Sequence, residues 1–523
     1  MARPEAKLKE LKPADLKQQV AARRDLVVTI NRRSEARLIP CGDEFLYQKL
    51  PVGTRVINPP APLDELPDPD QAIRYALLRP ENSDPLFAQL SPNLRVTIAV
   101  DDLSTPLPQM RRADLRERIL NQVLQTLGDY GVDDVHLVLA TGLRRHLDES
   151  EIRRVVGDKT FKQFWPDRLY NFDAENKSEL VGLGKTDRNE EVWISRRAAE
   201  SDLFVNVGLR QVSSDPSRAP GLGLAPYQTV RHLYEEGSAD RITRVINEHL
   251  NVFAVEATVN NHMYGPALDF LHKNEDLFND WDRTRLKGMG WALENMSNEF
   301  RRRLTQQYSA PYGLTGVWAG RTDTVRQKAA ARAFQQHGVP VKGQTDILIV
   351  GVPAVGSYNV NSIMNPILVQ AAALGQLFGL HRGKPLVREG GTLILCHPLR
   401  DEFHPEHHPS YIEFFHRCLA ESRDAGEFEA EFARNPTYIH MYRYGHAYHG
   451  VHPFQAWREG EAARRHLGRI IAAGCEERHV AARLGWDAAD TLDEAIALAT
   501  SDLGHTSTIT YLHAPPAVIA DVE

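Results

Sequence analysis

The stretch RVTIAVDDLSTPLPQMRR, residues 95–112, decides the fold class and raises the first question about function. Its first half is apolar without polar alternation, which is typical of a strand buried on both faces. The prolines that follow stop the strand, because proline has no backbone N–H for a β-ladder. Asp101 and Asp102 therefore end a buried strand, and Ser104 and Thr105 follow at once. Such groups either bind a ligand above the sheet or cap the next helix.

The same alternation of strand and helix recurs along the chain. DVHLVLATG (134–142) and DLFVNVG (202–208) are predicted strands, and the residues between them show helical spacing of apolar side chains. The pattern resumes at TDILIVGVP (345–353) and GGTLILCHP (390–398). We therefore expect an α/β fold of two domains, 1–319 and 320–523, with mainly parallel sheets and a cleft between the domains.

Composition limits the function classes. The chain has 523 residues, 42% hydrophobic and 25% charged, with a formal net charge of −7, which argues against a nucleic-acid partner. Its four cysteines lack CxxC spacing, and we find no run long enough for a membrane helix and no secretory leader. We expect a cytoplasmic protein with a small-molecule ligand and no membrane partner. Whether it forms a homo-oligomer is left open.

Two further strand ends carry polar or glycine-rich sequence. After the strand that ends at Thr141 and Gly142, Arg144 and His146 offer an anion-binding fork and a proton-transfer group. The alternative is a solvated basic turn. The segment 203–234, LFVNVGLRQVSSDPSRAPGLGLAPYQTVRHLY, has a Gly- and Pro-rich loop after a strand. Such a loop can cradle a phosphate, but it is neither a Walker A motif nor GxGxxG.

Histidines gather in two stretches of the second half, 396–411 and 438–454. Neutral imidazole suits Zn²⁺ or Ni²⁺, so the stretches are a candidate metal site; the alternative is solvated loops with incidental histidines. The candidate ligands are His397, His404, His407, His408, His440, His446, His449 and His452, with Asp401, Glu402 and Glu406 to complete the shell.

Taken together, the three strand ends resemble the nickel-pincer lactate racemase family, whose motifs are D-x-T-R-P-x-P, A-T-G-x-H-R-P and a Gly-rich loop. The resemblance covers about 35 to 515, and the segment from about 255 to 312 looks like an insertion. It implies a two-domain α/β protein that racemises or epimerises 2-hydroxy acids in the cleft. The implied cofactor is a nickel-pincer nucleotide, which takes a hydride from the α-carbon, while two histidines exchange the hydroxyl proton.

Several positions depart from the family motifs. Asp102 matches the aspartate that holds the nucleotide in the family, but Thr105 stands where the family has arginine. Arg144 stands at one catalytic histidine and Ser213 at the other. Neither side chain exchanges a proton readily near neutral pH. His146, two residues beyond Arg144, is the nearest substitute if the turn shifts.

The remaining family positions match loosely. Arg218 lies closest to the lysine that attaches to the cofactor. His232, or Tyr234 if no gap is allowed, approximates the nickel-coordinating histidine. Asn361 is the matched position of an Asn-x-x-Gln-x-x-Lys pattern in the second half.

The sequence thus predicts a 2-hydroxy-acid racemase or epimerase with an atypical site. The alternatives are a metal-dependent hydrolase or lyase built on the histidine stretches, with zinc as its metal, and a non-catalytic relative that binds a nucleotide or hydroxy acid. The predicted catalytic residues are His146, His232 and Arg144, with His232 also the metal ligand. The predicted cofactor-binding residues are Asp101, Asp102, Ser104, Thr105, Thr141, Gly142, Ser213, Arg218, Gly221, Gly223 and Asn361.

Overall fold

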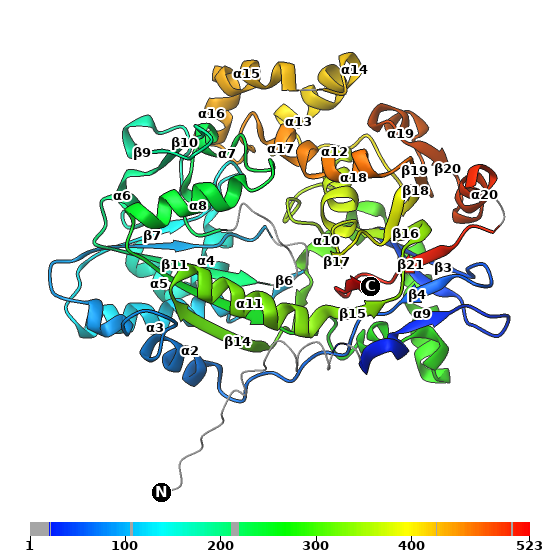
Figure 1. The fold of residues 1–523 in the computed structure, drawn as a ribbon, viewed down its shortest axis with the longest axis horizontal. Coiled ribbons are helices and arrows are strands. Elements are labelled where there is room, and N and C mark those ends of the chain that lie inside the picture. The colour runs from blue at the N-terminus through cyan, green and yellow to red at the C-terminus, as the bar shows by residue number, and fades with distance from the viewer. Residues whose placement is uncertain (1–19, 21, 105–107, 211–218, 425, 504–505) are drawn as a thin grey trace, which may run out of the picture.

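Two large sheets lie side by side in the computed structural model of the chain, with helices packed around both (Figure 1). The structure describes residues 20, 22–104, 108–210, 219–424, 426–503 and 506–523. Most strand pairs in the two sheets are parallel, which confirms the predicted α/β fold class.

The first sheet has six strands in the order β14-β12-β11-β5-β7-β8. Neighbouring strands are parallel except β14, which runs antiparallel to β12. The strands are β5 (Arg95–Val100), β7 (Asp134–Leu139), β8 (Leu169–Asn171), β11 (Leu203–Arg210), β12 (Val252–Val259) and β14 (Leu314–Gly320).

Both faces of the first sheet are covered, as the unbroken apolar strands predict. Successive residues of β5 point into different cores: Ile98 and Val100 belong to the core that contains the buried side chains of helix α3 (Leu115–Asp129), and Ala99 belongs to the core that contains those of helix α8 (Ser238–His249). This alternation follows from the two-residue period of a strand.

The second sheet is built from both ends of the chain. Its order is β1-β4-β21-β16-β18-β19-β20, with β2 paired to β16 and β3 to β2. The strands are β1 (Val27–Thr29), β2 (Arg37–Gly42), β3 (Glu44–Gln48), β4 (Arg55–Ile57), β16 (Thr345–Pro353), β18 (Val387–Cys396), β19 (Arg469–Ala473), β20 (Asp487–Ala489) and β21 (Ile509–Leu512).

The predicted division at residue 319 does not coincide with the division between the sheets. The first four strands precede the Pro-rich connection near residue 60, yet they pair with the second sheet, where β4 runs parallel to β21. Short apolar strands carry no signal that says which sheet they join, so this pairing is settled only in the folded chain.

The remaining described strands form three small sheets. They pair β9 with β10, β6 with β13, and β22 with both β15 and β17. The bounds are β6 (Gln109–Met110), β9 (Leu180–Lys185), β10 (Glu191–Ser195), β13 (Ser309–Ala310), β15 (Gly338–Val341), β17 (His381–Gly383) and β22 (Ile519–Val522).

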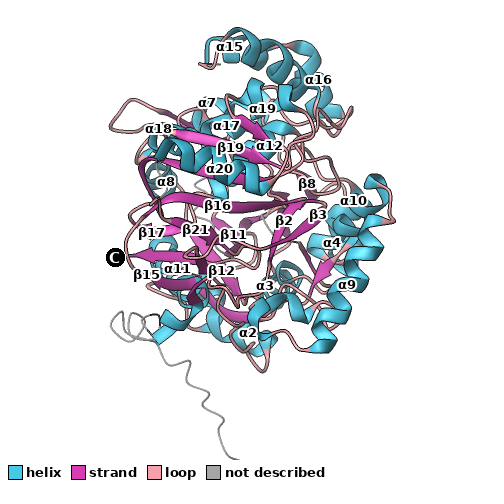
Figure 2. Cartoon of the chain, turned by 90° about the vertical axis from the view of Figure 1, so that its right-hand side faces the viewer, coloured by secondary structure: helices cyan, strands magenta, loops and turns pink. Residues whose placement is uncertain are grey.

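Helices follow most strands of both sheets (Figures 1 and 2). Besides α3 and α8 they are α2 (Pro69–Leu78), α4 (Glu149–Val156), α5 (Asp158–Phe164), α6 (Arg196–Ala199), α7 (Tyr227–Val230), α9 (Asp280–Glu294), α10 (Asn298–Gln307), α11 (Thr322–His337), α12 (Pro366–Gln370), α13 (Pro409–Glu413), α14 (Leu419–Glu421), α15 (Gly426–Arg434), α16 (Pro436–Tyr444), α17 (His452–Glu459), α18 (Glu461–His466), α19 (Arg478–Leu484) and α20 (Leu492–Leu503).

The segment predicted as an insertion from about 255 begins later than expected. Residues 255–259 belong to β12, in the interior of the first sheet, so the departure from the α/β pattern starts after Val259. This segment contains two helices, α9 and α10, because Ser297 caps a new helix by accepting from the Phe300 N–H. Figure 2 shows α9 and α10 near β2 and β3.

Candidate functional site

The three predicted strand ends meet at one edge of the first sheet. Strands β11, β5 and β7 are adjacent and parallel, with Val207 opposite Val100 and Val100 opposite Leu139. Beyond the strands, the Gly142 N–H donates to the Gly223 carbonyl over 2.8 Å, which brings the glycine-rich turn to the same edge. The structure therefore joins the strand ends as the parallel topology predicts.

Asp102 forms a buried ion pair with Arg144 at this edge. Its Oδ2 accepts from Arg144 Nε at 2.6 Å and from Ser104 Oγ at 2.8 Å, and its Oδ1 accepts from the Ser104 N–H at 3.1 Å. Arg144 also donates from Nη2 to the Ala140 carbonyl at 2.7 Å. Both side chains are nearly inaccessible, so two groups predicted to meet a cofactor or substrate bind each other.

Asp101 and the backbone around it are held from two directions. Asp101 Oδ2 accepts from the Leu209 N–H at 3.2 Å, and Arg116 of α3 donates to the Asp101 carbonyl at 3.1 Å. Arg116 is buried and paired with Asp114 at 2.7 Å. Sequence reasoning did not single out Arg116; its signal was an arginine two residues after the helix-capping Asp114, directly behind the proline loop.

The glycines of the site serve close packing within the chain. A Cβ on Gly223 would stand 2.5 Å from the Ala140 Cβ, and one on Gly221 would stand 3.0 Å from Ile246 Cγ2. Gly142 has a φ of +56°, which favours glycine. Thr141 is fully buried and donates to the Phe172 carbonyl at 3.3 Å. These residues hold the strand ends together rather than forming an open cradle.

His146 is a half-buried neutral base at this edge. Its Nε2 lies 3.1 Å from the Phe172 carbonyl, which can only accept, so Nε2 carries the proton and Nδ1 the lone pair. Burial lowers the pKa of His146 below its ordinary value. Its Nδ1 has no hydrogen-bond partner in the described parts of the chain. The ring packs against Tyr442, with centroids 4.7 Å apart.

The strand ends face the second half of the chain. Tyr442 donates to the Gly142 carbonyl at 2.9 Å, the His449 N–H donates to the Leu143 carbonyl at 3.1 Å, and His446 Nδ1 lies 3.1 Å from the His146 carbonyl. The second histidine stretch therefore packs directly onto the loop that holds His146.

Asn361 also reaches this region from the second half. It has a φ of +52°, and its Nδ2 donates to Glu151 Oε1 at 2.7 Å. Glu151 is buried and pairs with Arg145, which donates to the Val360 carbonyl at 2.9 Å. Asn361 thus lies beside the strand-end loop and is hydrogen-bonded to a residue of α4.

His232 bonds Glu235 and makes no contact with His146 among the described residues. Its Nδ1 is 2.6 Å from Glu235 Oε1, and its side chain is 34% exposed. The structure therefore does not join the two predicted proton-transfer groups. Thr105, Ser213 and Arg218 lie outside the described residues.

The two histidine stretches do not form the predicted metal site. In the described ranges, no three His, Cys, Asp or Glu side chains are placed to hold a metal ion. Instead His407 Nδ1 bonds Ser362 Oγ at 2.9 Å, and His452 Nδ1 bonds the Tyr411 hydroxyl at 2.5 Å. Burial lowers the pKa of His407 to about 3. Other histidines of the two stretches bond carbonyl or carboxylate groups: His446 Nδ1 lies 3.1 Å from the His146 carbonyl, and His449 Nε2 lies 2.9 Å from Glu175 Oε1.

The described residues do not fit the nickel-pincer nucleotide that the resemblance implies. The aspartate expected to hold the nucleotide is bonded to Arg144 and Ser104, and Gly223 has no room for a ligand beside Ala140. The histidine expected to coordinate nickel, His232, is partly exposed and bonded to Glu235.

No described helix is long and apolar enough to cross a membrane.

Comparisons with known proteins agree with the fold. Residues 45–212 match the model of the lactate racemase N-terminal domain. The structure of the lactate racemase apoprotein from Thermoanaerobacterium thermosaccharolyticum aligns over 93% of this chain and 100% of that chain, with 15% identity and a TM-score of 0.59. A crystal structure of a protein from Thermotoga maritima aligns over 87% of this chain and 98% of that chain, with 12% identity and a TM-score of 0.49. No curated protein matches. Residues 45–212 thus resemble the lactate racemase N-terminal domain, and the chain as a whole shares the fold of the lactate racemase apoprotein.

Proposed function

We propose that the chain is an isomerase that racemises or epimerises a small 2-hydroxy acid, with His146 as its proton-transfer residue. The observation that carries the proposal is the state of His146: a neutral imidazole, fixed by the Phe172 carbonyl, with its lone pair on an unbonded Nδ1. It lies where three strand ends meet in a lactate racemase-like fold.

Because the pincer nucleotide does not fit, the proposal uses proton chemistry. His146 Nδ1 takes the α-hydrogen of the hydroxy acid as a proton, and the electron pair of the broken C–H bond passes into the carboxylate to give a planar enediolate. The enediolate turns in the site, and His146 returns the proton to its opposite face, which inverts the α-carbon. Burial disfavours the imidazolium, so His146 stays neutral near pH 7 and gives the proton back readily.

A second function is favoured by a specific contact. Asp102 and Arg144, two charged groups at the strand ends, form an ion pair with each other. Such a site suits a relative that binds a hydroxy acid without converting it.

The test is chiral chromatography of a panel of 2-hydroxy acids, with the reaction run in D₂O. We expect interconversion with deuterium at the α-carbon, lost in His146→Gln and kept in His440→Gln, which removes an exposed histidine. Thermal stabilisation by a hydroxy acid without interconversion would favour the second function. Full activity of His146→Gln would refute the role of His146.

A second experiment tests whether the chain binds the nickel-pincer nucleotide. The protein is made in a host that also carries the enzymes for pincer synthesis, and its nickel is measured. We expect nickel far below one atom per chain. Stoichiometric nickel, with interconversion that retains the α-hydrogen, would contradict both the poor fit and the proton route.

A further inference from the structure

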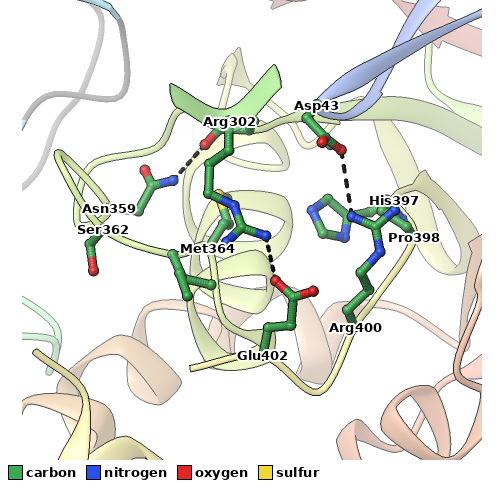
Figure 3. A pocket seen from close by; sticks show the side chains of 12 residues that line it. Asp43, Arg302, Asn359, Ser362, Met364, His397, Pro398, Arg400 and Glu402 are labelled. Carbon is green, nitrogen blue, oxygen red and sulfur yellow. Dashed lines mark hydrogen bonds and ion pairs between the residues drawn. The ribbon is translucent and has the colours of Figure 1, made fainter. Parts of the chain in front are cut away.

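An open pocket lies at the carboxyl ends of three neighbouring strands of the second sheet (Figure 3). It follows β2, β16 and β18, and Arg302 of α10 reaches it from the segment after Val259. Its empty space is about 450 Å³, mouth included. The polar lining residues labelled in Figure 3 are Asp43, Arg302, Asn359, Ser362, His397, Arg400 and Glu402. None of the strand-end residues predicted from the sequence lines it.

His397 presents an unused N–H to this pocket. The side chain follows β18 and is 6% exposed. Its Nδ1 accepts from the Leu399 N–H at 3.0 Å, so Nδ1 holds the lone pair and Nε2 carries the hydrogen. Burial, with a smaller effect from Arg400, lowers the pKa of His397 to about 3, so the ring is neutral. In the described parts of the chain this Nε2–H has no acceptor.

Two arginines of the pocket also keep part of their guanidinium groups unused. Arg400 donates from Nε and Nη2 to Glu476, both at 2.8 Å, while its Nη1 stands 3.7 Å from Asp43 Oδ1, too far for a hydrogen bond. Arg302 pairs with Glu402 through Nη2. Its Nε and Nη1 have no hydrogen-bond acceptor among the described residues. Figure 3 shows the Arg400 guanidinium beside His397 and the Arg302 guanidinium pointing toward Glu402.

The rest of the lining sets the charge and size of a ligand. The two arginines face Asp43 and Glu402, and Arg400 also pairs with Glu476, so the charged groups carry no excess positive charge and a single negative charge is accommodated better than two. Apolar lining comes from Met364, Ile363, Pro398 and Ala354. A ligand that satisfies the spare N–H groups must bring acceptor oxygens, and a carboxylate matches an arginine edge.

We propose that this pocket binds a small monocarboxylate with an apolar substituent, its carboxylate bonded to His397 Nε2, Arg302 and Arg400. The apolar part lies on Met364 and Pro398. This site goes beyond the proposed isomerase function and does not rest on it. The two regions share the loop 354–364, since Ser362 lines the pocket and Asn361 bonds Glu151 beside the strand ends.

Butyrate is the probe, with butyramide as its neutral counterpart and inorganic phosphate as a more highly charged anion, all measured by isothermal titration on the full chain. We expect millimolar butyrate to bind and butyramide and phosphate to bind at least tenfold more weakly. Arg302→Gln should weaken butyrate at least tenfold, because a charge-assisted hydrogen bond is lost. Glu402→Gln should tighten it, because Arg302 is then released from its partner.

Arg303→Gln is the matched control, since Arg303 is the next residue of α10, is exposed and does not line the pocket. It should leave butyrate affinity unchanged, as should His146→Gln, which separates this site from the isomerase proposal. Equal affinity in Arg302→Gln and Arg303→Gln would overturn the proposal, as would equal binding of butyramide or preferred binding of phosphate. If Arg302→Gln fails to fold, judged by circular dichroism, unchanged or weaker binding in Glu402→Gln refutes it.

Discussion

At the scale of single residues, one ion pair replaces the chemistry that the motifs of this chain lead one to expect. Arg144, predicted from the motifs to replace a catalytic histidine, lies 2.6 Å from Asp102, the aspartate expected to hold a nucleotide. Both groups are buried. A buried pair is costly to break, because removal of one partner leaves the other charge without compensation.

We predict that Asp102→Ala lowers the free energy of unfolding by about 3 kcal/mol, because Arg144 Nε is left without its carboxylate. The measurement is urea denaturation followed by circular dichroism. The double variant Asp102→Ala/Arg144→Met should recover part of the loss, since it leaves neither charge of this pair buried without its partner. Asp129→Ala, which removes an exposed carboxylate at the end of α3, is the control. A loss no larger than that of the control would show that the pair is not structural.

A buried histidine predicts how stability depends on pH. His337 is 1% exposed, its Nδ1 bonds the Ala517 carbonyl at 3.2 Å, and burial lowers its pKa from 6.5 to about 4. As the pH falls below 6.5, His337 takes up a proton in the unfolded chain but stays neutral in the folded chain until about pH 4. Stability is therefore lost between pH 6.5 and about 4, by about 3 kcal/mol for this group.

Urea denaturation at about pH 7 and about pH 5 measures this loss. His337→Gln should show a smaller loss between the two conditions than the parent chain. His440→Gln, which removes an exposed histidine, should match the parent chain. An unchanged pH dependence in His337→Gln would contradict the assignment.

At the scale of elements, the segment after Val259 is fixed to the second sheet by buried charge. Glu275 is fully buried; its Oε1 accepts from the Leu38 N–H of β2 at 2.9 Å, and its Oε2 lies 3.5 Å from Arg37 Nη1. On α10, Arg301 pairs with Asp43 at 3.3 Å. These contacts hold α9 and α10 beside β2, and they explain how Arg302 comes to line the pocket.

Glu275→Gln should loosen this segment, because the neutral amide keeps the size of the side chain but not its charge beside buried Arg37. We expect a local loss of about 2 kcal/mol, which corresponds to more than tenfold faster cleavage by trypsin within residues 280–307. Mass spectrometry of the fragments measures it. Glu299→Gln, an exposed change on α10, should be cleaved at the parent rate. Cleavage of Glu275→Gln at that same rate would show that Glu275 does not anchor the segment.

At the scale of the whole molecule, the two halves are joined through the strand ends of the first sheet. Tyr442 is fully buried; its hydroxyl donates to the Gly142 carbonyl at 2.9 Å and accepts from the Ala174 N–H at 3.1 Å. Arg443 pairs with Asp173 at 2.8 Å, and His449 with Glu175 at 2.9 Å. One short segment of the second half thus contacts two loops of the first.

We predict that Tyr442→Phe costs about 2 kcal/mol of unfolding free energy, because the Ala174 N–H stays buried without an acceptor. Hydrogen exchange should show faster exchange at the Ala174 amide. Tyr444→Phe, at a side chain that is 72% exposed, should change neither quantity. Parent-like exchange at Ala174 in Tyr442→Phe would mean that the contact does not hold the halves together.

Much of the local structure could be predicted because its cause is local. TDILIVGVP forms β16 over Thr345–Pro353, as an unbroken apolar run predicts. The acidic start of the helix after residue 147 becomes a capping box of Asp148 and Glu151. The approach of Asp102, Gly142 and the glycine-rich turn also follows from the parallel order of the strands, since their carboxyl ends share one edge.

The partners of the polar groups depend on contacts between distant parts of the chain. No residue near Asp102 in the sequence indicates that Arg144 pairs with it. Likewise, no residue near His397 in the sequence indicates the pocket that its Nε2 faces. The sequence by itself determined the strands, the helices and the class of the sheets, because side-chain periodicity and capping act within a few residues. Only the tertiary structure decided that the first strands join the second sheet and that the strand-end charges pair with each other. Those outcomes depend on which buried groups find a partner across the fold.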